Sequence, residues 1–280
     1  MSVSPISPLP DISVRRGSMV SAVAALFVLT LRQQLRGRRP LVLSLLFLLP
    51  AVLAIVFKFL PFPPTTDVLE FALIFNLIPH ALAPLTALLY AAGAIQDEVE
   101  EQTLTYLLIR PLPRWALYVT RTVAAWLTTT VLTALFTTVA LTVIYWNTPM
   151  LWGSVLPRRA ATVAALMALA QAGYCSLFGL LGLLTRRSLI AGIAYIIAFE
   201  GLLANFDAVV RRLTVTYYFR VLSLRWLALP HTEEWSIPLS DAPSADECLT
   251  TLLGVSALLV LLGAVMIRQR EFLMKTAEGR

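Results

Sequence analysis

The chain has 280 residues, of which 58% are hydrophobic and only 14% are charged, and its formal net charge is +6. Soluble domains carry about a quarter charged residues, so this composition excludes a water-soluble fold of this size. The basic residues lie between long apolar blocks rather than in one patch, which is typical of topology signals at a membrane surface and argues against a nucleic-acid partner.

The first apolar stretch, residues 19–31, is too short to cross a bilayer and is followed at once by Arg32, Gln33, Gln34 and Arg36. A stretch of this length with a polar end favours a helix that lies in the membrane interface. The alternative is an additional transmembrane span. We therefore interpret residues 1–40 as a cytoplasmic N-terminus that contains one interfacial helix.

Longer apolar blocks follow. A bilayer core about 30 Å thick needs about 20 helical residues, and five blocks meet that length. A sixth block is shorter and is interrupted by Glu200, although residues 190–199 are strongly apolar. The sequence predicts an all-α membrane protein with six transmembrane helices within residues 41–267 and a cytoplasmic tail at 268–280. The expected spans are about 41–60, 71–95, 122–146, 160–184, 189–206 and 249–267.

The distribution of Arg and Lys predicts the orientation of these spans. With the N-terminus inside, fifteen of the 22 Lys and Arg residues fall on the cytoplasmic side and seven on the outside. Because basic residues near span ends favour the cytoplasm, we expect both termini there. Residues 207–247 would then lie outside, where Trp226 and its apolar neighbours would form an interfacial or re-entrant piece.

The connection between the second and third spans, residues 96–115, has an ordered pattern. Four carboxylates stand at its start, leucines follow at helical spacing, and a proline and two arginines close it. Acidic residues first and basic residues last complement the helix dipole. The pattern predicts a short amphipathic helix outside the membrane, whose leucine stripe either docks on a partner or rests on the bilayer.

This segment resembles the signature of the ABC-2 type permease family, which has a Glu-rich start, then Gly-Thr-Leu, a leucine pair, and Pro and Arg. The family often has Gly where this chain has Gln102. The position after the second span and the six-span plan extend the resemblance over nearly the whole chain. The matching residues are Asp97, Glu98, Glu100, Glu101, Thr103, Leu104, Leu107, Leu108, Pro111 and Arg114.

The resemblance implies a permease subunit of an ATP-binding cassette transporter in the bacterial cytoplasmic (inner) membrane. Two permease chains, identical or related, would join two separate ATPase subunits, and residues 96–115 would dock on the ATPase. The absence of the phosphate-loop pattern G-x-x-x-x-G-K-[ST] fits ATP hydrolysis on a partner. We therefore expect no enzyme activity, cofactor or metal site in this chain itself.

A few polar residues within the expected spans are candidates for a transport pathway. Asn76 and His80 share a helix face beside Pro79, Thr133 belongs to a threonine stripe, and Glu200 is the lone carboxylate within a span. Intramembrane polar groups usually face the bundle interior or a pathway. The alternatives are helix–helix hydrogen bonds, threonine bonds to the backbone, and pairing of Glu200 with a nearby arginine.

The leading functional hypothesis is a permease subunit of an exporter. One alternative is a membrane enzyme or assembly factor that works without an ATPase, which would need converging ionisable groups in the membrane. Another is a secondary transporter, a class that often contains internal repeats and broken helices.

Overall fold

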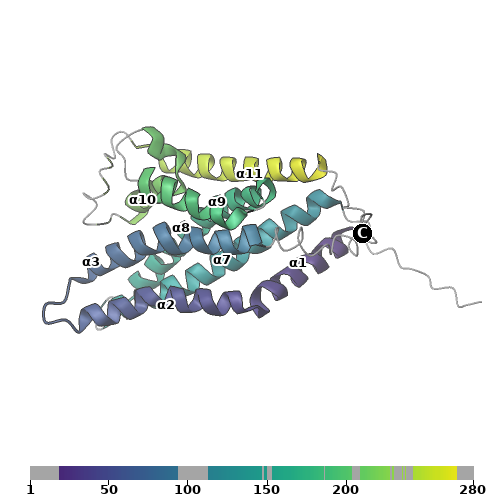
Figure 1. Cartoon of the computed structure of the whole chain (residues 1–280). Coiled ribbons are helices and arrows are strands. Elements are labelled where there is room, and N and C mark those ends of the chain that lie inside the picture. The colour runs from purple at the N-terminus through teal and green to yellow at the C-terminus, as the bar shows by residue number, and fades with distance from the viewer. Residues whose placement is uncertain are drawn as a thin grey trace, which may run out of the picture.

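The structure is a computed structural model, and it shows an elongated bundle of helices (Figure 1). All regular structure among the described residues is helical, which confirms the all-α prediction. The described residues are 19–93, 113–146, 148–149, 153–185, 187–203, 209–227, 229, 235, 237 and 242–269.

Within these ranges, five helices are long and apolar enough to cross a membrane, and they correspond to five of the six expected spans. The second of them is composite, because α-helical and π-helical turns alternate along it. The five are α2 (Arg38–Lys58), the composite α3 (Thr66–Glu70), η1 (Phe71–Leu82), α4 (Ala83–Ala87) and η2 (Leu88–Ala92), then α7 (Arg114–Ile144), α8 (Val155–Leu184) and α11 (Ala245–Gln269).

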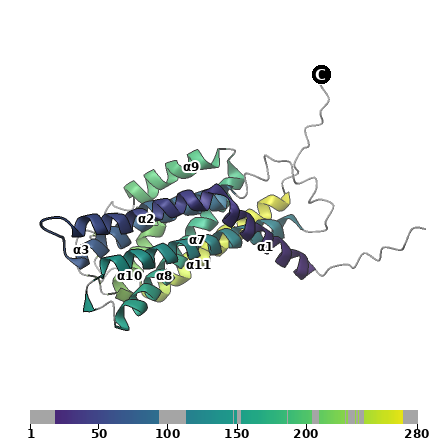
Figure 2. The ribbon, with the colours of Figure 1, turned by 90° about the horizontal axis from the view of Figure 1, so that it is seen from below.

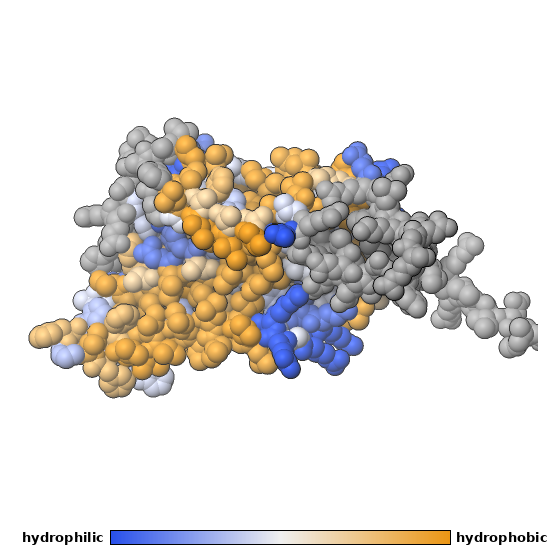
Figure 3. All heavy atoms as spheres, in the orientation of Figure 1, coloured by the Kyte–Doolittle hydropathy of each residue, from blue (hydrophilic) through white to orange (hydrophobic). Residues whose placement is uncertain are grey.

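The expected interfacial helix is α1 (Met19–Arg36), which is longer than the apolar stretch that predicted it and is not among the five. It packs along α7, where the Thr128 hydroxyl donates a hydrogen bond to Gln34 Oε1 at 2.7 Å. Hydrophilic residues gather on the surface where α1 meets α2 (Figure 3). Leu26 and Thr30 of α1 are buried against the bundle, whereas Val20, Val28 and Leu29 are exposed and the end of the helix carries the polar residues Arg32, Gln33, Gln34 and Arg36.

The bundle has two ends. We call the end next to residues 94–112 the proximal end and the opposite end the distal end. At the proximal end, Gly93 and Pro113 flank that segment, and a Cβ placed on Gly182 of α8 would lie 3.2 Å from Ala92 Cα. The N-terminal start of α1 and the C-terminal end of α11 also lie on the proximal side of the bundle (Figures 1 and 2). At the distal end, Lys58 Nζ donates a hydrogen bond to the Val143 carbonyl oxygen at 2.8 Å and so ties α2 to the last turn of α7.

In the described part of the sixth expected span, 189–206, the helix is shorter than the five helices that could cross a membrane. This helix, α9 (Ser188–Tyr195) with η4 (Ile196–Leu202), extends for about 22 Å at 1.5 Å per residue, which is shorter than the bilayer core. A 3-10 turn η6 (Val209–Leu213) and the helix α10 (Val215–Leu227) follow.

Helix α10 packs on α8 inside the bundle instead of standing outside it, and most of its side chains are buried. The Tyr174 and Thr216 hydroxyl oxygens lie 3.1 Å apart, so the start of α10 faces the interior part of α8. The sixth position of the bundle is thus filled by two short helices, one from each end (Figure 1).

Close packing of α11 on α7 depends on one glycine. A Cβ built on Gly263 would lie 2.3 Å from Tyr118 Oη, whereas a Cβ on Gly254 of the same helix would meet nothing within 4 Å. Glycines at helix interfaces in membranes allow such close approach.

We therefore expect Gly263→Leu to lower the free energy of unfolding by about 2 kcal/mol through overpacking. Gly254→Leu is the matched control and should leave stability unchanged. Thermal unfolding of the purified protein in detergent measures both variants, and equal midpoints for the two would contradict the packing seen between α7 and α11.

Candidate functional site

Most of the residues that predict a coupling segment, from Asp97 to Pro111, lie outside the described residues. The structure describes its last member, Arg114, as an exposed residue at the first position of α7. On the other flank, Arg39 Nη1 lies 3.0 Å from the position that a Cβ on Gly93 would occupy. The start of α2 therefore rests directly on the end of the second span.

Glu200 lies within η4, two residues before its end, and is fully buried. Its two carboxylate oxygens accept hydrogen bonds from the first backbone N–H groups of α10, Val215 at 3.2 Å and Thr216 at 3.1 Å. The Tyr195 hydroxyl donates a third bond at 3.3 Å. A carboxylate at a helix N-terminus satisfies unpaired N–H groups and complements the helix dipole. Glu200 thus caps α10 from the preceding short helix.

Arg220 lies one turn after Thr216 on α10 and is only 5% exposed. Its Nη2 donates a hydrogen bond to His80 Nε2, and its guanidinium lies 5.5 Å from the centre of the Trp235 ring, a cation–π arrangement. The carboxylate of Glu200 is close enough to act electrostatically on Arg220. One buried cation therefore links α10 to the second span and to the capping carboxylate.

His80 belongs to the π-helical part of the second span, η1, which also contains Pro79. Because Arg220 can only donate, His80 Nε2 accepts, and the imidazole proton is on Nδ1, which donates to the Asn76 carbonyl oxygen at 2.8 Å. Trp235 Nε1 donates to Asn76 Oδ1 at 3.1 Å. π-Helical turns are often found at functional sites, and here one presents two polar side chains to Arg220 and Trp235.

The structure thus brings together three of the four candidate pathway residues and leaves one apart. Thr133 donates hydrogen bonds to the Thr129 carbonyl oxygen at 2.6 Å and the Thr130 carbonyl oxygen at 3.1 Å, as the backbone-bonding alternative predicts. We call the joined set the polar network. Its members are Asn76, His80, Tyr174, Tyr195, Glu200, Thr216, Arg220 and Trp235.

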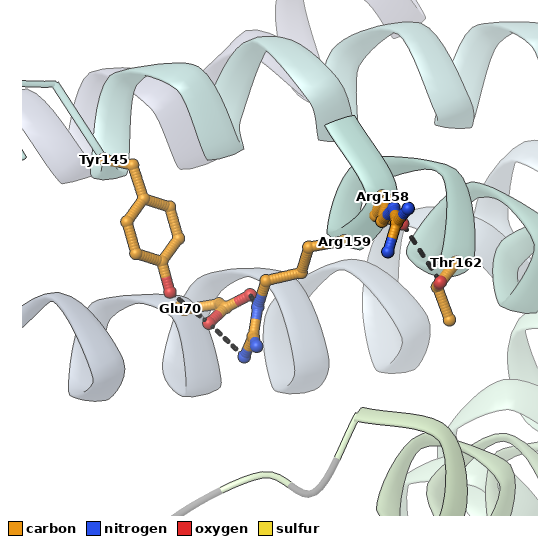
Figure 4. Close-up of polar contacts among 5 residues, drawn as sticks. All are labelled: Glu70, Tyr145, Arg158, Arg159 and Thr162. Carbon is orange, nitrogen blue, oxygen red and sulfur yellow. Dashed lines mark hydrogen bonds and ion pairs between the residues drawn. The ribbon is translucent and has the colours of Figure 1, made fainter. Parts of the chain in front are cut away.

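A second buried cluster, the distal clamp, consists of Glu70, Arg159 and Tyr145 (Figure 4). Arg159 binds Glu70 through two bonds, Nε to Oε1 at 2.6 Å and Nη2 to Oε2 at 2.7 Å, and the Tyr145 hydroxyl donates to Oε2 at 2.6 Å. Burial and the adjacent carboxylate raise the pKa of Tyr145, which keeps this hydroxyl a donor. The clamp joins the start of the second span, the end of α7 and the start of α8.

Sequence reasoning did not find Arg220, Trp235 or the distal clamp. Arg220 lies in a segment interpreted as external, although its spacing of four from Thr216 was a signal that both share a helix face. In the sequence, Glu70 and Arg159 are charged residues at the boundaries of two separate spans. The ion pair between them becomes evident only when those spans are packed together.

The polar network joins helices within the described part of the chain. No group of three or more His, Cys, Asp or Glu within these ranges is placed to hold a metal ion. The side chains of the polar network bind one another and a helix end instead. Such an arrangement holds two short helices and a π-helical span in register, and it would rearrange if they moved.

Comparison with known proteins agrees with this architecture. A search of curated proteins found no match. A family profile described as ABC-2 family transporter protein matches residues 24–268, which cover all but the last residue of the described helices that could span a membrane. The match covers far more than half of the chain, so this multi-pass membrane protein belongs to the ABC-2 family of transporter proteins.

Proposed function

We propose that this chain is the permease subunit of an ATP-binding cassette exporter in the bacterial cytoplasmic membrane. A second permease chain, identical or related, would complete the pathway, and a separate ATPase subunit would bind residues 96–115. The observation that carries the proposal is the family match over residues 24–268. Support comes from the acidic-to-basic segment that begins where the second span ends.

The second span offers a direct mechanical route from the ATPase into the membrane. It carries Glu70 of the distal clamp near its start, passes Asn76 and His80 in the polar network, and reaches Gly93 beside the proposed docking segment. At its proximal end it touches α8 nearly backbone to backbone, at Ala92 and Gly182. Closure of the ATPase dimer would therefore move the second span and α8 together, and the pathway would alternate between two states.

Docking can be tested by mutating the leucine stripe. Leu104→Asp and Leu107→Asp place a charge on the apolar face of the expected amphipathic helix, so each should reduce ATPase co-purification at least tenfold and the double variant should abolish it. Gln102→Asp is the matched control, since helical spacing puts residue 102 on the opposite face. Full recovery of the complex with both leucines replaced would refute the docking role.

One observation favours a second candidate, a secondary transporter, because that class often uses discontinuous helices whose ends face the bundle interior. The break between η4 and α10 has this form. The two candidates differ in energy source. In inverted membrane vesicles, uptake of an expelled dye that requires ATP and survives collapse of the proton gradient supports the permease. Uptake that needs only the gradient supports the secondary transporter.

A further inference from the structure

A groove on the bundle surface, separate from the polar network and the distal clamp, lies between α8 and the end of α10. It is lined by Ala161, Thr162 and Ala165 of α8 and by Arg225 and Trp226 of α10. The small side chains at four-residue spacing make a smooth apolar floor. Trp226, which is 39% exposed, forms a wall, and Arg225 stands at the edge.

One guanidinium group, that of Arg225, lines the groove, and a second, that of Arg158, belongs to the same helix as the alanines of its floor. Arg225 is fixed in place because its Nε and Nη2 donate to the Pro243 and Ala242 carbonyl oxygens, both at 2.9 Å. Arg158 precedes Ala161 by three residues and Ala165 by seven, so helical geometry puts all three on one face of α8. In Figure 4, Arg158 lies beside Thr162, whereas its neighbour Arg159 turns toward Glu70. No described carboxylate forms an ion pair with Arg158 or Arg225.

The depth of the groove matches the boundary between headgroups and acyl chains. Arg158 and Arg159 are the last charged residues before the apolar part of α8, and Ala161 and Ala165 lie about one and two turns after Arg158 along the helix. Tryptophan favours the interface. The groove thus begins among cations at headgroup level and becomes apolar toward the interior, which is the order of chemistry along a phospholipid.

We propose that this groove binds one anionic phospholipid from the leaflet at the distal end. Its phosphate would lie between the guanidinium groups of Arg158 and Arg225, and its glycerol and upper acyl chain would lie over Ala161 and Ala165 against Trp226. A lipid so placed would bridge α8 and the end of α10, the half-helix whose other end is capped by Glu200. This inference does not depend on the proposed ATPase coupling.

Native mass spectrometry of the full-length chain in detergent tests the site, with palmitoyl-oleoyl-phosphatidylglycerol and the corresponding phosphatidylcholine as probes. The wild type should retain one phosphatidylglycerol with clear preference over phosphatidylcholine. Because each basic residue near a lipid headgroup contributes about 1 kcal/mol, Arg158→Gln should weaken this binding about fivefold. Ala165→Leu should weaken it by filling the floor while leaving the net charge unchanged.

Matched controls are Arg212→Gln, which removes an exposed arginine away from the groove, and Ala257→Leu, which enlarges an exposed alanine of α11. Both should bind phosphatidylglycerol like the wild type. Equal binding of the two lipids, or equal loss in the Arg158 and Arg212 variants, would overturn the proposal. So would a result in which Ala165→Leu separates two copies of the chain without changing lipid retention, since the groove would then be a protein interface.

Discussion

Replacing Glu70 with Gln should lower the free energy of unfolding by about 3 kcal/mol, because breaking a buried ion pair leaves the partner charge uncompensated. The Glu70 side chain is 2% exposed, and it receives two bonds from Arg159 and one from Tyr145. Arg159 retains 17% exposure, so some of its charge can be solvated, which keeps the loss at the lower part of the usual range.

The measurement is chemical unfolding of the purified protein in mixed detergent micelles, with Asp67→Asn as the matched control. Asp67 lies on the same short helix α3, but it is exposed, so its replacement should change stability by less than about 0.5 kcal/mol. The double variant Glu70→Gln with Arg159→Gln should be more stable than the sum of the single changes predicts, since it removes both charges. Strict additivity would show that the two residues do not interact.

The distal clamp also bears on how the bundle moves. It joins the second span to α7 and α8 at the distal end of the bundle. A movement of the second span that begins at Gly93 would pass along the polar network before it reaches the distal clamp. Under the proposed function, Glu70→Gln would also uncouple the two ends of the span, and loss of transport while the proposed ATPase still co-purifies would reveal it.

The long spans could be predicted because each depends on local composition alone. A charge-free block of about 20 residues satisfies the bilayer whatever its neighbours do, so α2, α7, α8, α11 and the composite span all follow from the sequence. The sixth could not, because its form depends on a bond between Glu200 and backbone groups fifteen and sixteen residues later. The interruption of the apolar run at Glu200 was the local sign of that break.

In the polar network too, some features follow from residues close together in the sequence, and others depend on contacts between distant segments. Asn76 and His80 are four residues apart, so a shared face follows from helix geometry. This face meets Arg220 only because α10 packs against α8. The sequence does not predict that packing, since a short helix with two arginines is also compatible with a position outside the membrane. The π-helical form of η1 also could not be predicted, because the sequence places Pro79 within a helical span without indicating the type of helix.

A carboxylate that caps a helix inside the bundle gives the break a definite physical role. The first N–H groups of a helix lack partners within it, and in a membrane no water is present to bind them. Glu200 supplies those partners from the preceding helix, while Arg220 keeps the opposite charge nearby. The two short helices are thereby held in register although the 3-10 turn η6 stands between them.

Glu200→Ala is the second change with a large expected effect. It removes three hydrogen bonds and leaves Arg220 without the nearby carboxylate, so we expect a loss of about 3 kcal/mol in the free energy of unfolding. Glu200→Gln retains one acceptor oxygen, and its loss should stay near 1 kcal/mol, the usual cost of a helix cap. Both substitutions should loosen the start of α10 under conditions in which the rest of the fold stays intact.

Hydrogen exchange at the Val215 and Thr216 amides reads out this local effect, because each 1.4 kcal/mol of lost protection speeds exchange about tenfold. We expect about fivefold faster exchange in Glu200→Gln and about 100-fold in Glu200→Ala at these two amides. The Tyr217 amide, which donates to Thr214 Oγ1, should change less. Glu247→Gln is the matched control, since Glu247 caps α11 through the Ser244 N–H at 2.8 Å but is exposed. If exchange at Val215 and Thr216 were the same in the Glu200 and Glu247 variants, the buried cap would not hold α10 in place.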